Sequence, residues 1–297
     1  MSNVTNTSVI ENDSVTATPK KKKMIQKDKL IAYIIVALGA VIMLAPFYFM
    51  FIFSSHSNTG ILSVPPPIFI GEYLVENFKT LLEFLPYFWN NLALSLYIAI
   101  VVTALNLLFC SLAGYAFAMF DFKYKNLLFV GIMATMLLPP FLGMIPTAMI
   151  MSTIGWMNDP KALIVPAACG AMGIFMMRQF ISSSIPKELV EAARMDGCRE
   201  FKIYYRVIVP LILPAFGTLG LITFIGTWNN FMGPLVVMSD MKKFTIPLAL
   251  RALQGTGQVP WGAVSMGAAI AVLPLLILFI MASRRLIDGL TSGAVKG

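Results

Sequence analysis

The stretch ELVEAARMDGCREFKIYYRVIVPLILPA, residues 188–215, joins a short charged segment to a long apolar one. Its first ten residues hold four charged side chains and two alanines, with apolar residues at helical spacing. Glu188 suits the positive N-terminal end of a helix, and Gly197 suits the position just after a helix C-terminus. The pattern predicts a short helix over about residues 185–197 that ends at Gly197.

The residues beside this helix define its ends and its surroundings. Ser183 or Ser184 can cap its N-terminus, and Pro186 fits its first turn. A second amphipathic segment runs from Arg199 into the apolar run. The charged helix is too polar for hydrocarbon, so we expect it at a membrane surface. It is either a plain connector between two spans or a docking element, because small residues let a partner's backbone approach closely.

The composition of the whole chain is that of a polytopic membrane protein. Of its 297 residues, 58% are hydrophobic and only 12% are charged, which departs far from soluble domains; the mean hydropathy is +0.80. A helix needs about 20 apolar residues to cross about 30 Å of hydrocarbon. The fold class is therefore all-α with six transmembrane helices. The six apolar runs are residues 30–53, 92–118, 127–151, 161–181, 207–227 and 264–283.

The chain is predicted to have three parts. Residues 1–29 are rich in Ser, Thr and Asn and end in a lysine cluster, so we expect a disordered basic tail. The first apolar run is too long for a secretory signal, and no convincing cleavage site follows it, which favours a retained helix. Residues 30–284 are predicted to form the transmembrane domain, and residues 285–297 a C-terminal tail.

Basic residues are distributed unequally between the two sides of the membrane. Most of the 22 Lys and Arg fall in the N-terminal tail, the links 119–126 and 178–206, and the C-terminal tail. Because basic loops stay inside the cell, both termini and the charged helix are predicted to be cytoplasmic. The net charge of +8 thus reports topology and does not indicate nucleic acid. The other side holds Lys79, Lys161, Lys242, Lys243 and Arg251.

The centres of the predicted spans contain no Asp, Glu, Lys or Arg. Ion-coupled carriers usually keep such a residue in the bilayer, so a stand-alone secondary carrier for a small solute is the less favoured alternative. A membrane anchor without transport is a further one. The single histidine, His56, cannot build a His-based catalytic or metal cluster, and no GxxxxGK[ST] motif binds ATP. We therefore expect no catalytic residue, no metal site and no cofactor bound by this chain.

Cysteine and proline allow plain structural interpretations. The three cysteines offer no external disulfide pair and no metal-site spacing, so they are interpreted as small apolar residues. Each proline in a span removes a backbone donor and bends its helix, which suits alternating access but is also common in membrane helices. The cysteines are Cys110, Cys169 and Cys198, and the prolines are Pro139, Pro140, Pro146, Pro166, Pro210, Pro214 and Pro274.

The stretch quoted above resembles the EAA signature of ABC-importer permeases. That signature has Glu-Ala-Ala, three residues, Gly, nine residues and an Ile-x-Leu-Pro element. Glu191, Ala192 and Ala193 match its first part, and Gly197 stands at the matching distance. The last element reads Val-Ile-Val-Pro at residues 207–210, which is a conservative departure.

Further stretches are similar to the carbohydrate (maltose-type) branch of these permeases. They are FMMRQFISSSIPKELVEAARMDG at 175–197, TFIGTWNNFMGPLVVMSD at 223–240 and LIDGLTSGAVKG at 286–297. The similarity covers about residues 25–297 and is greatest to the smaller, six-helix member of the paired permeases. It implies a type I ABC-importer permease fold and a role in importing di- or oligosaccharides across the bacterial cytoplasmic (inner) membrane.

In that family the EAA helix is the coupling helix, which docks in a cleft of a separate ATPase subunit. The resemblance implies that Glu191 pairs there with a basic residue, that the two alanines pack in the cleft, and that Gly197 permits the tight turn. Arg194 and Asp196 either add polar contacts or remain solvated. The implied coupling residues are Glu191, Ala192, Ala193, Asp196 and Gly197.

The resemblance also implies a set of partners. They are a second homologous permease that completes a heterodimer, an ATPase dimer that binds ATP and Mg, an extracytoplasmic sugar-binding protein, the sugar and the lipid membrane. The ending GAVKG resembles a tail that reaches the ATPase interface, which implies contacts by Lys296 and Gly297.

Two further regions are candidate sites. The external link 228–262 is long, and its tip at Gly255, Thr256 and Gly257 is expected to be flexible. The resemblance implies contact of this link with the binding protein; a loop without a partner is the alternative. Candidates for the substrate pathway are polar or aromatic residues at membrane depth: Tyr97, Thr103 and Asn106.

Overall fold

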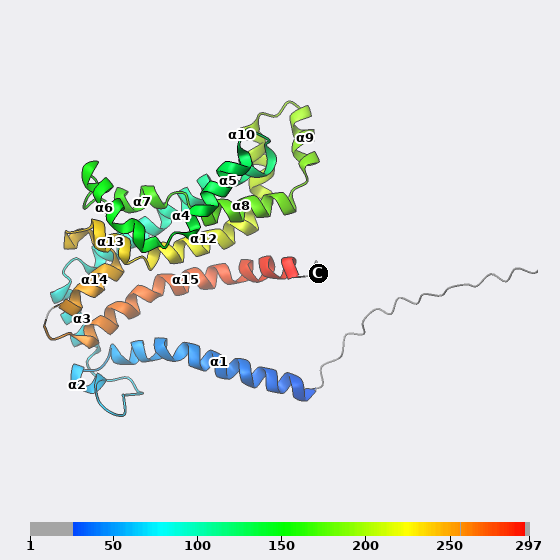
Figure 1. Cartoon of the computed structure of the whole chain (residues 1–297). Coiled ribbons are helices and arrows are strands. Elements are labelled where there is room, and N and C mark those ends of the chain that lie inside the picture. The colour runs from blue at the N-terminus through cyan, green and yellow to red at the C-terminus, as the bar shows by residue number, and fades with distance from the viewer. Residues whose placement is uncertain (1–25, 256, 295–297) are drawn as a thin grey trace, which may run out of the picture. The chain divides into compact units, whose positions relative to one another are not determined.

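The computed structural model describes residues 26–255 and 257–294. The chain divides into two compact units, residues 1–46 and 47–297, and helix α1 (Gln26–Phe53) extends across their boundary. The described part of the first unit is the beginning of α1. Within the described residues every regular element is helical, so the predicted all-α class is confirmed (Figure 1). The predicted tail up to residue 25 lies outside the described residues.

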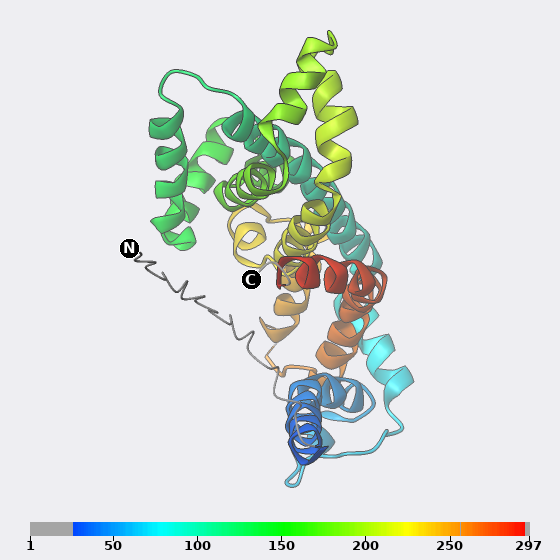
Figure 2. The ribbon, with the colours of Figure 1, turned by 90° about the vertical axis from the view of Figure 1, so that its right-hand side faces the viewer.

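The second unit is built around α4 (Phe88–Met119), a helix of 32 residues. At about 1.5 Å per residue it is about 48 Å long, which exceeds the hydrocarbon core. Helices α8 (Ala171–Ser184) and α12 (Leu213–Trp228) pack along it. The short helices α7 (Lys161–Ala167) and α14 (Ile246–Ala252) also contact it, so α4 lies among its neighbours in the centre of this unit (Figure 2).

Glycines let α8 approach α4 at backbone distance. A Cβ atom added to Gly114 would lie 2.6 Å from the Cβ of Met177 and 2.8 Å from the backbone nitrogen of Arg178. A Cβ atom added to Gly173 would lie 2.6 Å from the Sγ of Cys110. Small residues at such positions are what allows membrane helices to pack closely.

The count of membrane-spanning helices depends on two bent segments. Among the described residues, four helices are long and apolar enough to cross a membrane, and the number rises to six if each bent helix pair is one span. The four are α1, α4, the stretch Lys161–Ser184 that contains α7 and α8, and α15 (Trp261–Ala294). The six predicted runs agree with the upper count, and the bent pairs coincide with the third and fifth runs.

The first bend lies at Leu138 and Pro139. Leu138 has an extended backbone, with ψ 125°, as expected for a residue before proline, and no helix continues through it. The predicted third run is therefore two helical pieces at an angle to each other. These pieces are α5 (Lys125–Ala134) with η1 (Thr135–Leu137), and η2 (Pro140–Gly143) with α6 (Met144–Thr153).

The second bend lies at Ile212, between Pro210 and Pro214. The helical pieces before and after it meet at 79°. Because Pro210 has no N–H to donate one turn back, the preceding helix widens into a π-helical turn before it. The pieces before the bend are α10 (Glu200–Ile203), the π-helical turn η3 (Tyr204–Ile208) and α11 (Val209–Leu211).

The predicted boundaries of the transmembrane domain differ from the helix ends. Helix α1 begins at Gln26, before the predicted start at residue 30. Helix α15 continues to Ala294, through most of the predicted tail 285–297. The sequence places no proline between Pro274 and Ala294, so nothing in it forces the helix to end earlier.

The predicted external link 228–262 is largely helical and packed, not an extended loop. Ile246 and Leu253 are fully buried against α4 and its neighbours. The Nδ2 group of Asn91 donates to the carbonyls of Met241 at 2.9 Å and Phe244 at 2.8 Å. Asn91 thus ties the start of α4 to the link. The link holds α13 (Met232–Val237), η4 (Met241–Lys243), α14 and η5 (Leu253–Gly255).

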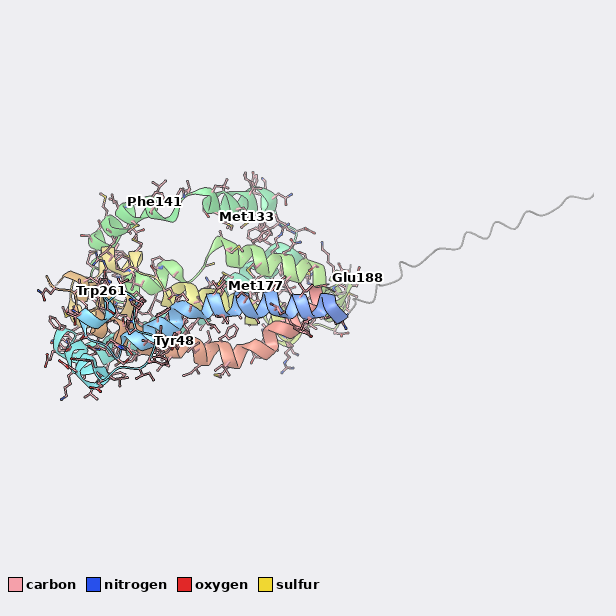
Figure 3. The ribbon with its side chains drawn as sticks, turned by 90° about the horizontal axis from the view of Figure 1, so that it is seen from below. Tyr48, Met133, Phe141, Met177, Glu188 and Trp261 are labelled. Atoms are coloured by element: carbon pink, nitrogen blue, oxygen red, sulfur yellow. The ribbon has the colours of Figure 1, made fainter. Side chains whose placement is uncertain are left out.

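The two ends of the second unit carry different elements. Helix α3 (Leu74–Phe84) packs against α15 near the start of α4. Helix α9 (Lys187–Met195) and α10 lie beyond the other end of α4 (Figure 1). Figure 3 accordingly shows Glu188 of α9 and Trp261 of α15 at opposite ends. The charged helix predicted from the sequence is therefore separated from the external link by the length of the bundle.

The contact of α4 with α8 leads to the first prediction. Gly114→Ala should destabilise the protein by about 1–3 kcal/mol, because backbone atoms of α8 would have to move. Such a loss lowers the melting temperature by about 2–10 °C in a domain of this size. Gly131→Ala in α5 is the control, since no atom lies within 4 Å of its added Cβ. Equal melting temperatures for the two purified variants would contradict the packing argument.

Candidate functional site

Helix α9 begins directly after an extended proline. Pro186, in an extended conformation, is the residue before the first helical residue, Lys187, and Glu188 lies in the first turn. Ser183 and Ser184 end α8 and do not cap α9. The sequence prediction of a serine cap with Pro186 inside the first turn is therefore wrong, because α8 continues one turn further than expected.

Helix α9 ends at a glycine turn. Gly197 has φ +76°, a left-handed conformation that costs other residues about 1–2 kcal/mol. The N–H of Gly197 donates to the carbonyl of Arg194 at 2.9 Å, and that of Cys198 to the carbonyl of Ala193 at 3.1 Å. These two bonds form a Schellman motif, which satisfies the last carbonyls of the helix. The structure thus agrees with the predicted end of the helix at Gly197.

The two faces of α9 have different surroundings. Val190 is fully buried, and Ala193 packs beside it on the cluster formed by α4, α8 and α10. Glu191, Ala192 and Asp196 are exposed. None of the ion pairs among the described residues includes Glu191. The helix therefore presents an acidic side chain and a small one on its outer face while its inner face is fixed.

An ion pair joins the end of α9 to the start of α10. The Nε of Arg194 donates to Oε1 of Glu200 at 2.7 Å, and its guanidinium lies over the ring of Phe120 at 5.1 Å. The hydroxyl of Tyr115 donates to Oε2 of Glu200 at 2.8 Å. The hydrogen bond to Glu200 raises the pKa of Arg194. We call Tyr115, Phe120, Arg194 and Glu200 the clamp, because they link α9 and α10 to the end of α4.

A second set of charges lies beside the clamp. Asp121 pairs with Lys125 at 3.1 Å and with Lys187 at 4.0 Å. The hydrogen bond from Lys125 is the main cause that lowers the pKa of Asp121. Since Asp121 is exposed to solvent, these pairs add little to stability.

A hollow of about 250 Å³ lies between α9 and the end of α4. Charged groups of both signs and an apolar floor share it, so it suits an amphipathic side chain better than an apolar ligand. Its lining residues are Met119, Phe120, Asp121, Lys187, Val190, Glu191, Arg194 and Glu200.

Large apolar side chains are exposed on α9 and on the segment that follows it. Leu189, Met195, Phe201 and Tyr205 are exposed, although they are large and apolar. They belong to α9, α10 and the π-helical turn. Large apolar side chains left exposed near one another in sequence are typical of a surface that a protein partner covers.

The three substrate-pathway candidates on α4 lie in different surroundings. Tyr97 is exposed, whereas Thr103 is half-buried and donates to the carbonyl of Ala99 at 2.7 Å. Asn106 is buried; its Nδ2 donates to the carbonyl of Ala167 at 3.2 Å, and its Oδ1 accepts from Thr223 at 3.4 Å. Nine residues separate Tyr97 from Asn106, which puts them on opposite faces of the helix. The structure does not bring the three together.

The remaining predicted residues lie at or beyond the described ends. Gly255 ends η5, and Gly257 has φ +84°. Thr256, Lys296 and Gly297 lie outside the described residues.

Two features were not foreseen from the sequence. The clamp joins residues separated by up to 85 positions, from Tyr115 to Glu200. The thiols of Cys110 and Cys169 lie 3.9 Å apart, although neither residue was expected to contact a second cysteine. In the part of the chain that the structure describes, no group of three His, Cys, Asp or Glu could hold a metal ion.

Comparison with known proteins identifies relatives over most of the chain. Residues 107–291 match the family model described as a binding-protein-dependent transport system inner membrane component. An arabinooligosaccharides transport system permease protein of Halalkalibacterium halodurans is 34% identical over 223 residues, which are 75% of this chain and 80% of that protein. A lactose transport system permease protein of Rhizobium radiobacter is 32% identical over 270 residues, 90% of this chain and 96% of that protein.

A solved structure has the same fold. It is the crystal structure of a bacterial ABC transporter involved in the import of the acidic polysaccharide alginate, and one of its chains superposes with a TM-score of 0.75. The match covers 90% of this chain and 99% of that chain, at 21% sequence identity. The EAA-like helix, the all-α membrane fold and the matches over most of the length agree. This chain belongs to the family of inner-membrane permease components of binding-protein-dependent ABC transport systems.

Proposed function

We propose that this chain is one of two permeases in an ATP-driven importer of di- or oligosaccharides. The relatives that support a sugar substrate are named for arabinooligosaccharides, lactose and diacetylchitobiose. Relatives named for sn-glycerol-3-phosphate are 30% identical over 275 residues, so the family also includes permeases named for a different solute. Because the chain belongs to this family, the alternative hypothesis of a stand-alone secondary carrier is dropped.

The observation that supports this mechanism is that α9 has an exposed outer face while its inner face packs against α4 and α8. Glu191, at the edge of the hollow, and Ala192 are both exposed, while Val190 and the clamp hold the helix to α4 and α8. We infer that α9 docks on a separate ATPase subunit, with Glu191 meeting a basic residue and Ala192 allowing close approach. Ala193, Asp196 and Gly197 complete the proposed contact region.

The remaining assembly follows from this role. ATP and Mg bind to an ATPase dimer, a second homologous permease completes the pathway, and an external binding protein delivers the sugar. The chain itself then catalyses nothing. The tip at Gly255–Gly257 is the proposed contact with the binding protein, and Lys296 and Gly297 are proposed to reach the ATPase. In this arrangement α9 and both termini lie in the cytoplasm, as the basic residues predict.

The substrate pathway is the least specified part of the proposal. Tyr97 is exposed on α4 and is available to stack on a sugar ring. Thr103 and Asn106 already bond to protein carbonyls, so a role in binding sugar requires those bonds to be exchanged. Among the three, Tyr97 is therefore the first residue to substitute in an uptake assay.

Reversal of one charge tests the docking role. Glu191→Arg should reduce uptake of the sugar recognised by the binding protein more than tenfold, since like charges facing each other in a docked interface cost roughly several kcal/mol. Uptake is measured in cells that lack the native copy, with the amount of chain in the membrane quantified. Glu83→Arg in α3, an exposed glutamate at the opposite end, is the control and should transport normally. Undiminished uptake by Glu191→Arg would refute the docking role.

The clamp makes a separate prediction. Glu200→Gln should weaken the attachment of α9 to α4 and lower both uptake and binding-protein-stimulated ATPase activity about three- to tenfold, the range expected for a partly exposed charged hydrogen bond. The exchange of Arg194→Glu with Glu200→Arg restores the ion pair and should recover part of the loss.

The control for the clamp is Asp121→Asn. It removes the two ion pairs of the exposed Asp121 beside the same hollow and should have little effect. The prediction fails if Glu200→Gln and Asp121→Asn lower uptake and ATPase activity equally. It also fails if the charge exchange gives no more uptake than Arg194→Glu or Glu200→Arg alone.

A further inference from the structure

The segment after α1 is an uncharged stretch at the end of the bundle opposite α9. Residues 57–71, SNTGILSVPPPIFIG, contain no Asp, Glu, Lys or Arg. Only α2 (Asn58–Ile61) is helical in it. The remainder, residues 62–70, is here termed the apolar loop. Glutamates return directly after it, at Glu72 and Glu76.

The apolar loop exposes its side chains to an unusual degree. Five large apolar residues that are nearly consecutive lie on the surface, although soluble surfaces rarely expose such a contiguous patch without a partner. Their exposed fractions are Leu62 69%, Val64 95%, Ile68 52%, Phe69 77% and Ile70 77%.

The loop is nevertheless held in one place at its base. The N–H of Gly71 donates to Oγ of Ser55 at 2.8 Å, and the N–H of Tyr73 donates to the carbonyl of Ser55 at 3.0 Å. A Cβ atom on Gly71 would lie 2.4 Å from that carbonyl oxygen, so the chain passes where only glycine fits. The exposed side chains are thus displayed by an anchored backbone.

The anchors place the loop at the level of the membrane boundary. The Nδ2 of Asn58 donates to the carbonyl of Val259 at 2.9 Å, and its Oδ1 accepts from the N–H of Gly262 at 3.4 Å. These contacts fix α2 beside the first residues of the spanning helix α15, where Trp261 is exposed (Figure 3). Exposed Trp at the end of a span is typical of the headgroup level.

A further bond turns the loop back along α1. The hydroxyl of Tyr48 donates to the carbonyl of Ile68. Tyr48 lies five residues before Phe53, the last residue of α1, which is about 7.5 Å along the helix axis. Ile68 of the apolar loop is therefore beside the last turns of α1 and not beyond them.

We propose that the apolar loop, residues 62–70, inserts into the outer headgroup and acyl boundary of the bilayer as a lipid anchor. The absence of charge, the exposed aliphatic and aromatic side chains and the return toward α1 all match an interfacial membrane segment. A binding protein that must dock and leave uses a more polar contact surface. Lipid contact also requires no second protein to be present at this position.

Spin-label accessibility tests the proposal. Phe69→Cys is made in a chain with Cys110→Ala, Cys169→Ser and Cys198→Ser, labelled with a nitroxide, and reconstituted in phospholipid nanodiscs together with its co-purifying subunits. Oxygen, which concentrates in lipid, should relax the label more than a water-soluble nickel chelate does. Glu72→Cys is the matched control, three residues further on, and should show the opposite preference.

Two results would overturn the proposal. A label at residue 69 that prefers the nickel chelate lies in water, and a label shielded from both reagents is covered by protein. If the cysteine-free chain fails to fold, Phe69→Trp in the native chain replaces it. Brominated lipids should then quench more fluorescence than in the unsubstituted chain, and an unchanged quenched fraction would refute lipid contact. Neither readout depends on transport, so the outcome is independent of the proposed function.

Discussion

Helix α8 lies against α4 so closely that glycine is required at two points of contact, Gly114 and Gly173. Lipid tails are as apolar as the side chains, so moving an apolar side chain from lipid to a helix interface gains little free energy. Two helices are therefore held together mainly by van der Waals contacts, which small residues allow to be close. The position of α9 depends on this contact, because only Ile185 and Pro186 separate α8 from α9. The outward direction of Glu191 is thus determined by packing within the membrane domain.

The polar residues of α4 serve a complementary purpose. A lipid-exposed stretch cannot leave backbone groups without partners, so irregular chain must be satisfied by protein. Asn91 donates to two carbonyls of the external link, Ser95 accepts from the N–H of Ile246, and Asn106 donates to Ala167 just before the break between α7 and α8. These residues stabilise the places where the neighbouring chain departs from a regular helix. The hydrogen bonds of these polar residues within the protein are therefore enough to explain their presence in α4, without a role in binding a ligand.

The sequence was sufficient to predict the class of fold and the position of α9 along the chain. It did not predict the contacts that attach α9 and α10 to α4. Apolar run length predicts spans, and Gly197 predicts the end of α9, because both depend on neighbouring residues only. Run length cannot reveal that a span is bent, although Pro139 and Pro210 indicated where the bends lie. The contact of Tyr115 with Glu200 depends on how α4 and α10 pack, which no local pattern contains. The helices of the external link were missed because they have only six and seven residues, too few for a helical period to be read from the sequence.

The two connections of α9 differ in backbone geometry, and this difference bears on how docking moves the bundle. On one side α9 follows α8, which is locked to α4 at Gly114. On the other side it leads through the π-helical turn to the 79° bend at Ile212 before α12 begins. Pro214 and Pro210 leave this bend with fewer backbone hydrogen bonds than a regular helix. Because the clamp also joins α9 directly to α4, a displacement of α9 should carry α4 and α8 as one body. The bend at Ile212 should absorb the change. Distances between spin labels on α4 and α8 that change with nucleotide, while those across Ile212 stay constant, would contradict this account.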